Sequence, residues 1–435
     1  MKRISILGLG YIGLPTAILA AECGYEVFGF DINNDKITRI NAGDPTILEP
    51  EIKKRLQYAL KKKNFKASTN LEYADCFLVT VPTPLKPSGN PDLQYVFKAS
   101  ESIAKRLMPG NLIIIESTVP VGTTEKLAKY IEDLSGLKQS ADFFITHCPE
   151  RGLPGVLFRE LIENDRVIGG ICQKSCELAY SFYSKFVKGF LHVTDDKTAE
   201  MIKLVENSSR DVQIAFANQV ASMCYSAGIN PYHVIELANK HPRVSILNPT
   251  CGVGGHCIAI DPAFLIDSFP NDTQLLQVAR EVNNNKPLSV IERLLQKVDE
   301  FNEIKESKAS ILGLGLSFKP NVDDIRESPA LFIAQELNKK KDVLTFTAYD
   351  SYVDPEPVKA LGLNLATNLR KAMSEADIIL ILVKHDEFKM ITHDLLCNKI
   401  VVDSCGLLHE IGKSQTQTFL TGAVKASCNL ENITF

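Results

Sequence analysis

The sequence predicts an α/β fold with two doubly wound domains joined by a long central helix, which belongs to a helical middle domain. Three observations support this prediction. Short apolar segments alternate with longer amphipathic ones in the first half and again near the C-terminus, as in parallel sheets covered by helices. About 30 residues in the middle contain no strong helix breaker. A strand-like segment followed by Gly-Leu-Gly occurs once in each half of the chain.

Residues 1–196 are expected to form the first domain. The strand-like segments of this domain are short, rich in β-branched or aromatic residues, and bounded by Gly, Pro or Asp. They cover residues 4–7, 26–30, 76–80, 112–116 and 143–147. Segments with helical periodicity, among them 92–107 and 124–134, lie between the strands. The alternation predicts a parallel sheet with helices on both faces.

Residues 197–304 are expected to form the helical middle domain. Residues 197–228 consist largely of helix formers and predict one helix of about 30 residues, or ~45 Å. A helix of this length with apolar residues on more than one face often lies between domains or subunits. Residues 272–298 predict a second long helix, in which Pro287 would cause a kink or a break.

Residues 305–414 return to alternating strands and helices and predict the second α/β domain. Its strand-like segments are 309–313, 343–348, 378–383 and 400–402. Residues 415–435 are polar and show no periodicity, so we expect a poorly ordered tail.

Composition and charge exclude several classes of protein. The 48 basic and 52 acidic side chains give a net charge of −4, so nothing favours binding to nucleic acid or to an acidic membrane surface. No apolar run approaches the ~20 residues that a membrane span needs. A strand and a glycine loop follow the first residues directly and leave no room for a signal peptide. Eleven cysteines without an export signal indicate reduced thiols in a cytoplasmic protein.

A glycine loop formed by Gly8, Gly10 and Gly13 follows the first strand and opens a helix. Glycines so spaced permit a tight turn, close approach of the backbone to a pyrophosphate, and close packing of the helix on the strand. Asp31 ends the second strand, where a carboxylate binds ribose hydroxyls and repels a 2′-phosphate. The loop therefore predicts an NAD site. The alternative is a glycine-rich turn in a domain that binds no nucleotide.

A second, degenerate glycine loop contains Gly313 and Gly315. Phe318 stands where the third glycine would be and would hold a helix away from the strand, and Lys319 follows it. We interpret this loop as a nucleotide-like site that has lost the nicotinamide cofactor in favour of a nucleotide substrate. A plain strand and turn is the alternative, because a match of two glycines is not specific.

Cys257 follows a glycine-rich loop, and Asp261 lies four residues later, one turn away if the segment is helical. Such a loop leaves room for a substrate, and a thiol near a helix N-terminus or a cation becomes a nucleophile. One alternative is a buried, unreactive cysteine. Another is a zinc site with Cys251 and His256, although adjacent ligands fit tetrahedral geometry poorly. We therefore predict no metal site.

Lys203 and Asn207 are four residues apart in the predicted long helix and so share a face. A lysine and an amide that point into one pocket can stabilise an oxyanion or polarise a carbonyl group. The alternative is an ordinary solvated helix face.

Taken together, these residues resemble the nucleotide-sugar 6-dehydrogenases, typified by UDP-glucose dehydrogenase. Seven motifs occur in the family's order, and together they extend over nearly the whole chain. They are residues 8–13, 81–84, 117–123, 148–151, 203–207, 254–257 and 318–329. Within the family, residues 149–155, 164–170, 198–201, 210–211, 215–218 and 241–244 look most like those of the UDP-N-acetyl-D-mannosamine dehydrogenases.

The resemblance implies a reaction and a set of site residues. It implies oxidation of a C6 alcohol to a carboxylate with two NAD per sugar, through a thiohemiacetal and a thioester on Cys257. The implied catalytic residues are Cys257, Lys203, Asn207, Asp261, Thr118 and Glu150. The implied cofactor residues are Gly8, Gly10, Tyr11, Ile12, Gly13, Asp31, Val81, Thr83, Thr118 and Arg326. The implied substrate residues are Glu150, Arg151, Lys203, Asn207, Arg243, Gly254 and Lys319. The implied assembly is a homodimer, or a higher homo-oligomer, formed through the long middle helix, and the implied product is a precursor of bacterial surface polysaccharide.

Two positions depart from the family pattern. UDP-glucose dehydrogenases carry a second glutamate four residues after the one aligned with Glu150, and this chain, although similar to them, has Pro154 at that position. This difference argues against UDP-glucose as the substrate. The family often has a basic residue two positions after the aspartate aligned with Asp403, and this chain has Cys405 there, so the resemblance does not imply contact with a partner subunit's substrate.

Three alternatives remain at this point. The same reaction can act on UDP-N-acetylglucosamine, UDP-N-acetylgalactosamine or UDP-glucose. A two-electron hydroxyacid dehydrogenase would share the first glycine loop but need no cysteine nucleophile. An inactive sensor of NAD or of nucleotide sugars would need no catalytic residues at all.

Overall fold

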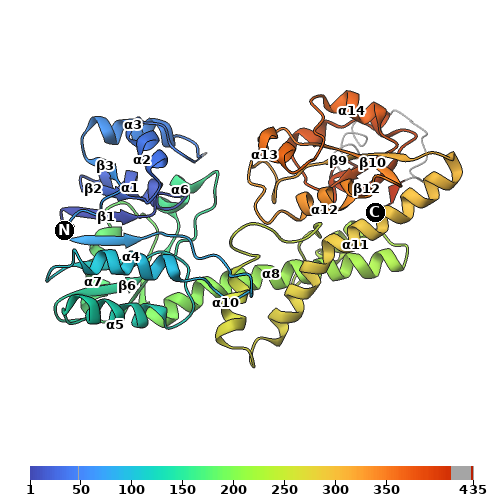
Figure 1. The fold of residues 1–435 in the computed structure, drawn as a ribbon. Helices are drawn as coiled ribbons and strands as arrows, with labels where there is room; N and C mark the ends of the chain where they lie inside the picture. The colour runs from blue at the N-terminus through green and yellow to red at the C-terminus, as the bar shows by residue number, and fades with distance from the viewer. Residues whose placement is uncertain (48, 413–432, 435) are drawn as a thin grey trace. The chain divides into compact units, whose positions relative to one another are not determined.

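The computed structural model describes residues 1–47, 49–412 and 433–434. The chain folds into two compact units, each of which Figure 1 shows with its own sheet. The first unit comprises Met1–Glu206 and Ala263–Pro270, and the second comprises Asn207–Pro262 and Asn271–Phe435.

The first unit contains an eight-stranded sheet with the order β3-β2-β1-β4-β5-β6-β7-β8. The strands are β1 (Arg3–Leu7), β2 (Glu26–Phe30), β3 (Phe65–Ser68), β4 (Cys76–Val79), β5 (Leu112–Ile115), β6 (Phe144–His147), β7 (Arg166–Gly170) and β8 (Leu191–Asp195). The predicted parallel pairing holds from β1 to β6. β7 pairs with β6 in the antiparallel direction and β8 runs parallel to β7. Doubly wound sheets accept reversed strands at an edge, because antiparallel pairing satisfies the same backbone groups.

Helices cover both faces of this sheet (Figure 1). One apolar core takes side chains from α1 (Gly13–Glu22), α2 (Asn34–Asn41), α3 (Ile52–Lys61), α6 (Leu157–Glu163) and α7 (Gln173–Tyr183). The opposite core takes them from α4 (Gln94–Ala104) and α5 (Thr123–Ser135). The two predicted helices in this region correspond to α4 and α5 within three residues at each end.

The predicted central helix is present as α8 (Asp196–Ser226), which is 31 residues long. Its buried residues include Leu204, Ser208, Asp211, Ala215 and Asn218, which recur every three or four positions. This spacing gives a continuous buried stripe along one side of the helix.

The second unit contains a parallel sheet with the order β10-β9-β11-β12-β13. The strands are β9 (Ala309–Leu314), β10 (Leu344–Tyr349), β11 (Ile378–Ile381), β12 (Ile400–Asp403) and β13 (Ile433–Thr434). The strand order reverses between β9 and β11, and crevices at such points bind ligands in open α/β sheets. β13 belongs to the predicted tail, and the other residues of that tail lie outside the described part of the chain.

Helices also cover both faces of the second sheet. One core takes side chains from α11 (Gln274–Lys305), α12 (Pro329–Asn338) and α13 (Pro355–Ala360), and the other from α14 (Leu369–Glu375) and η1 (Asp386–Met390). The shorter helices α9 (Pro231–Ala238), α10 (Asp261–Ser268) and α15 (His393–Leu396) complete the elements. The helix α11 continues through Pro287, so the expected break does not occur. Burial of Pro287 and of Val290, Ile291 and Leu294 holds the two parts in one helix.

Candidate active site

The glycine loop after β1 leaves no room for two side chains. Gly8 has a φ of +98°, and a Cβ there would lie 2.7 Å from the carbonyl oxygen of Thr80. A Cβ on Gly13, at the start of α1, would lie 1.8 Å from the carbonyl oxygen of Gly8. A Cβ on Gly10 would meet no atom within 4 Å. The loop thus combines a tight turn with an open backbone surface, which fits a dinucleotide pyrophosphate.

Asp31 lies directly after β2 and is tied to this loop. Its Oδ2 accepts a hydrogen bond from the backbone N–H of Leu9 (3.0 Å) and lies 2.9 Å from Nζ of Lys36. Its Oδ1 accepts from the N–H of Asn33 (3.0 Å). Burial opposes ionisation, but the hydrogen bonds from Lys36, Asn33 and Leu9 outweigh it and lower the pKa of Asp31. The carboxylate is therefore held in the orientation that ribose hydroxyls require.

The loops that follow β1, β4 and β5 are joined at the carboxyl edge of the sheet. Thr80 Oγ1 donates to the carbonyl oxygen of Gly8 (2.7 Å), and Ser117 Oγ donates to that of Val81 (2.7 Å). Val81, Thr83 and Thr118 are half-buried in these loops, as are Tyr11 and Ile12 in the glycine loop. The predicted cofactor residues of the first unit, listed above from Gly8 to Thr118, therefore share one edge of the sheet.

Glu150 belongs to a buried ion cluster that the sequence did not reveal. Its Oε2 lies 2.5 Å from Nη2 of Arg166, whose Nη1 lies 3.0 Å from Oε1 of Glu116. Tyr183 donates its hydroxyl proton to the same oxygen of Glu116 (2.6 Å). Burial, followed by the neighbouring charge of Glu150, raises the pKa of Glu116 to about 7, and Arg166 and Tyr183 oppose this rise. Two carboxylates thus share one guanidinium in the interior.

The loop after Glu150 is fixed by the same side chain. Oε1 of Glu150 accepts from the N–H groups of Arg151 (2.7 Å) and Gly152 (2.6 Å). The guanidinium of Arg151 forms an ion pair with Glu206 and donates to the carbonyl oxygen of Asp165 (3.2 Å). Three of the acceptor positions of Glu150 are thereby in use, and Arg151 is already paired with a carboxylate.

Lys203 is half-buried on α8, in a part of the helix that is fixed to the first unit. One turn earlier, Glu200 accepts hydrogen bonds from the N–H groups of Gly122 (2.5 Å) and Thr124 (2.7 Å) at the start of α5. His147 is fully buried at the end of β6. Burial, followed by the charge of Lys203, lowers the pKa of His147 to about 3. A neutral imidazole therefore lies near Lys203, and no sequence motif predicts this neighbour.

The second unit brings Cys257, Asp261 and Asn207 together. The carbonyl oxygen of Cys257 accepts from the N–H of Asp261 (2.8 Å), which confirms that one helical turn separates the two residues. Asn207 Nδ2 donates to Oδ2 of Asp261 (2.5 Å). Cys257 is exposed, unlike most of the other described cysteines. The buried-cysteine alternative is therefore wrong for this residue.

Gly254 and Gly255 bring the cysteine loop against the second glycine loop. A Cβ on Gly254 would lie 2.3 Å from the carbonyl oxygen of Glu327, and one on Gly255 (φ +81°) would lie 2.7 Å from the Phe318 ring. Phe318 was expected to hold a helix off its strand, but α12 begins only at Pro329. Phe318 instead packs on the glycines that precede Cys257.

The second glycine loop repeats the carboxylate contact of the first. Oδ2 of Asp350, directly after β10, accepts from the N–H of Leu316 (2.7 Å) and lies 3.1 Å from Nε2 of His385. Nζ of Lys319 lies 5.7 Å from the centroid of the Phe318 ring in the same loop. The predicted lysine is therefore placed beside a nucleotide-like loop, whereas Asp350 and His385 were missed because no sequence motif marks them.

Of the two remaining predicted cations, Arg243 lies outside these clusters. Arg326 is linked to the cysteine loop through Asp324, whose Oδ2 lies 3.6 Å from Nε2 of His256. Arg326 makes two hydrogen bonds to Asp324, from Nε (2.8 Å) and Nη2 (2.6 Å). Arg243 is exposed in the segment after α9, and its N–H donates to Nδ1 of His241 (3.4 Å). Asp403, in turn, is buried and accepts from the N–H groups of Gly406 and Leu408 (both 2.8 Å), so it closes the turn after β12.

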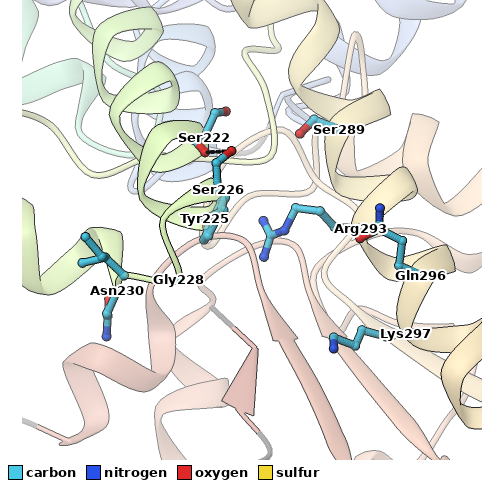
Figure 2. Close-up of a pocket in the computed structure, with 10 residues that line it drawn as sticks. Ser222, Tyr225, Ser226, Gly228, Asn230, Ser289, Arg293, Gln296 and Lys297 are labelled. Atoms are coloured by element: carbon cyan, nitrogen blue, oxygen red, sulfur yellow. Dashed lines mark hydrogen bonds between the residues drawn. The ribbon is translucent and has the colours of Figure 1, made fainter.

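A separate cavity of about 550 Å³ lies in the second unit between the end of α8 and α11 (Figure 2). Arg293 lies across it from α8, with its guanidinium carbon 3.5 Å from the centroid of the Tyr225 ring. The lining includes none of the predicted site residues.

The described residues offer no cluster of three His, Cys, Asp or Glu side chains that could hold a metal ion. Cys251, which the zinc alternative required, is buried, and its Sγ donates to the carbonyl oxygen of Leu382 (3.5 Å). Over the same residues, no helix is both long and apolar enough to cross a membrane.

A dinucleotide loop, a second nucleotide-like loop and an exposed cysteine beside an amide and a carboxylate define the class of the nicotinamide-dependent dehydrogenases. Residues 2–187 match the NAD binding domain of the UDP-glucose/GDP-mannose dehydrogenase family, residues 197–285 match its central domain, and residues 312–410 match its UDP binding domain. The chain belongs to the UDP-glucose/GDP-mannose dehydrogenase family and is an NAD-dependent UDP-sugar dehydrogenase.

Three relatives show the extent of the similarity. The UDP-N-acetyl-D-mannosamine dehydrogenase of Campylobacter jejuni is 44% identical over 90% of this chain and 98% of its own. The NDP-N-acetyl-D-galactosaminuronic acid dehydrogenase of Ralstonia nicotianae is 43% identical over 93% and 96%. The solved structure of the UDP-D-ManNAc dehydrogenase from Pyrococcus horikoshii is 41% identical, covers 93% of this chain and 96% of its own, and superimposes with a TM-score of 0.85.

Proposed function

We propose that this enzyme oxidises the C6 hydroxyl of UDP-N-acetyl-D-mannosamine to the carboxylate of UDP-N-acetyl-D-mannosaminuronate, for surface polysaccharide biosynthesis. The observation that carries the covalent part of the proposal is the cluster of Cys257, Asn207 and Asp261. The choice of sugar is supported by the name of the Campylobacter jejuni relative and by the residues that resemble this branch of the family.

NAD held by the first glycine loop would supply the hydride acceptor, and oxidation of an alcohol to an acid would consume two NAD per sugar. The first oxidation converts the alcohol to an aldehyde and releases a proton to water. Sγ of Cys257 then attacks the aldehyde carbon to give a thiohemiacetal. The second oxidation removes a hydride from this carbon and the hydroxyl proton, which passes to water, and leaves a thioester. Water attacks the thioester, the C–S bond breaks, and the carboxylic acid and the thiol are released. The covalent bond keeps the reactive aldehyde in the site.

Each polar residue receives a role in this scheme. Lys203 and Asn207 stabilise the oxygen that becomes negatively charged when sulfur or water attacks. Asp261 orients Asn207 and assists the thiol. Thr118 and Glu150 order the hydrolytic water, and Glu150 does so with the acceptor position that its three hydrogen bonds leave.

The substrate and the cofactor are assigned to different loops. Lys319 and Arg243 bind the sugar diphosphate as cations do, and Arg151 and Gly254 line the same substrate. Arg326 contacts the cofactor, whose other contacts are the residues of the first unit from Gly8 to Thr118 named above.

We further propose a homodimer that forms through α8. Phe216 and Met223 are exposed by 53% and 57%, and they lie seven residues apart, on one face of the helix. A second copy of the chain can cover this apolar face. Phe216→Lys together with Met223→Lys should halve the mass measured by light scattering, and an unchanged mass would refute the α8 interface. We also propose a cytoplasmic location, which the expected reduced thiols favour.

The test is the amount of NADH formed per mole of UDP-N-acetylmannosamine, for the wild type and for Cys257→Ser. Two NADH per sugar, with turnover lost in the variant, is the expected result. One NADH per sugar, or full turnover of Cys257→Ser, would refute the thioester step. Cys23→Ser is the matched control, because Cys23 is exposed as well but lies in the first unit after α1.

The same assay with three other sugars tests the substrate. UDP-N-acetylgalactosamine is the competitor that the Ralstonia nicotianae relative suggests, and UDP-N-acetylglucosamine and UDP-glucose complete the series. A kcat/KM for any of them above that for UDP-N-acetylmannosamine would reassign the substrate and leave the chemistry in place.

A further inference from the structure

A buried chain of side-chain amides connects α8 and α11 to the loop that carries Cys257. Oδ1 of Asn218 accepts from the backbone N–H of Thr250 (2.9 Å), and Nδ2 of Asn218 donates to Oδ1 of Asn283 (3.0 Å). Nδ2 of Asn283 donates in turn to Oδ1 of Asp211 (2.8 Å) and to its carbonyl oxygen (3.0 Å). Arg280 pairs with Asp211 at 2.7 Å. The three inner residues of this hydrogen-bonded series, Asp211, Asn218 and Asn283, are at most 1% exposed.

The two ends of the chain determine the orientation of both amides. The N–H of Thr250 can only donate, so the atom of Asn218 that faces it is the oxygen. The carboxylate of Asp211 can only accept, so the atom of Asn283 that faces it is the nitrogen. These two requirements leave Nδ2 of Asn218 opposite Oδ1 of Asn283, which is a hydrogen bond. Flipping either amide would bring two acceptors or two donors together inside the protein, which is costly.

The loop is attached to the same face of α8 at two points. Asn218 holds its beginning at Thr250, and Asn207 holds its end at Asp261. Asn207, Asp211 and Asn218 are four and seven residues apart and therefore share one face of the helix. The two attachment points are eleven residues, or about 16 Å, apart along α8.

The loop needs such attachments because its own sequence is flexible. Gly252 has a φ of +142° and Gly255 a φ of +81°. Glycine adopts such conformations readily, but it loses more conformational freedom on folding than other residues do. Within the loop, Thr250 Oγ1 donates to the carbonyl oxygen of Gly252 (2.7 Å). The contact of Asn218 with Thr250 therefore fixes the turn from which the loop proceeds to Cys257.

We propose that Asn218, oriented by Asn283 and Asp211, is a positioning residue that holds the Cys257 loop in its reactive geometry. The proposal rests on the proposed role of Cys257 as the nucleophile. It extends the site to three side chains that contact neither cofactor nor substrate. Outer groups that orient reactive ones typically change activity by about 10- to 100-fold when they are removed.

The test uses the donor-to-acceptor direction of the hydrogen bonds between Thr250 and Asp211. Asn218→Asp keeps an acceptor for Thr250 but places a carboxylate oxygen opposite Oδ1 of Asn283, so kcat should fall about 10- to 100-fold with little change in the KM for NAD. The double variant Asn218→Asp with Asp211→Asn has the same net charge as the wild type and allows Asn283 to turn over, which reverses the side-chain bonds that Asn283 forms with positions 211 and 218. The bond of Asn283 to the carbonyl oxygen of residue 211 and the ion pair of Arg280 are not restored. It should recover part of the lost kcat.

Asn302→Ala is the matched control. Asn302 lies on α11 and also bridges two backbone groups, the N–H of Ala309 and the carbonyl oxygen of Val343 (both 2.8 Å), but these contacts lie at the amino ends of β9 and β10. Its kcat should stay within about twofold of the wild type. A double variant no more active than Asn218→Asp, or an Asn218→Asp with wild-type kcat, would overturn the proposal.

Alkylation separates this proposal from the proposed function. The rate at which iodoacetamide modifies Cys257 in the folded enzyme can be measured without turnover. The extent of modification is read from the peptide that contains Cys257 after digestion. We expect this rate to change at least about threefold in Asn218→Asp and to return toward the wild-type value in the double variant. An unchanged rate in Asn218→Asp would overturn the positioning role even if Cys257→Ser is inactive. If Cys257→Ser is active but the alkylation rates follow the expected pattern, the thioester mechanism fails and the attachment of the loop stands.

Discussion

Replacing Glu116 by glutamine should make the stability of the first unit less dependent on pH. Glu116 follows β5 directly and is fully buried, with Oε1 bonded to Arg166 (3.0 Å) and Tyr183 (2.6 Å) and with Oε2 without a hydrogen-bond partner. Glutamine keeps the oxygen that both donors use and places a neutral amide nitrogen at the other position. The change therefore removes a titrating group and preserves the contacts.

The sign and size of the effect follow from the pKa of Glu116. Burial and the charge of Glu150 raise this pKa from 4.5 to about 7 in the folded protein. A raised pKa means that the stability contribution is complete below pH 4.5 and is lost as the pH rises through about 7. This difference in pKa between the folded and unfolded states corresponds to about 3 kcal/mol of stability, which is lost at pH 8. Glu116→Gln should therefore gain stability relative to the wild type as the pH is raised from 5 to 8.

Native-state hydrogen exchange of the amides in β5 measures this difference without requiring the whole chain to unfold in one step. The opening free energy of Glu116→Gln minus that of the wild type should rise by about 3 kcal/mol between pH 5 and pH 8. Glu26→Gln, on the exposed side of β2, is the control and should show no such rise. The same difference at pH 5 and pH 8 would refute the reasoning, because it would show that Glu116 does not take up a proton in this range.

Two further predictions concern the glycine loop. Gly13→Ala should abolish NAD binding or destabilise the first unit by more than about 2 kcal/mol, because the new Cβ would lie 1.8 Å from the carbonyl oxygen of Gly8. Gly10→Ala should fold with wild-type stability and lose only affinity for NAD, because its Cβ would meet no atom within 4 Å. Thermal melting and NAD titration distinguish the two, and a stable, NAD-binding Gly13→Ala would contradict the model of the loop. Lys36→Met should lower kcat/KM for NADP about threefold relative to that for NAD, because it leaves the charge of Asp31 uncompensated; steady-state kinetics with both cofactors would show an unchanged ratio if Lys36 has no such influence.

The elements that the sequence predicted are those with a strong local signal. The strands β1, β2, β4, β5 and β6 are short apolar runs, and the structure confirms each within one residue at either end. β7 begins with Arg166 and ends with two glycines, and β8 is largely exposed, so neither presents an apolar run. The arginine of β7 pairs with Glu116 and Glu150, and those partners lie 50 and 16 residues away in the sequence.

The same distinction applies to the site. Asp31 and the turn between Cys257 and Asp261 follow from spacing, because a strand end and a helical turn have fixed geometry. The hydrogen bonds of Asn218 and Glu150 do not follow from spacing, since their partners come from other elements. A buried arginine or asparagine in an otherwise apolar segment is the signal that could have indicated them, because such side chains must find partners.

The two glycine loops show how one local design serves two purposes in this chain. In each, a carboxylate after the neighbouring strand accepts from a loop N–H, from Leu9 to Asp31 (3.0 Å) and from Leu316 to Asp350 (2.7 Å). The first loop leads directly into α1, and a helix N-terminus favours the pyrophosphate of a cofactor.

The second loop has no helix at that position, because α12 begins only at Pro329. The Phe318 ring, which occupies the place of the third glycine, packs against Gly255, two residues before Cys257. The residue that excludes a second dinucleotide loop is therefore the one that joins the UDP binding domain to the cysteine loop. A change at Phe318 should consequently alter the alkylation rate of Cys257 as well as the affinity for the nucleotide sugar, whereas a change at Gly10 should alter the affinity for NAD alone.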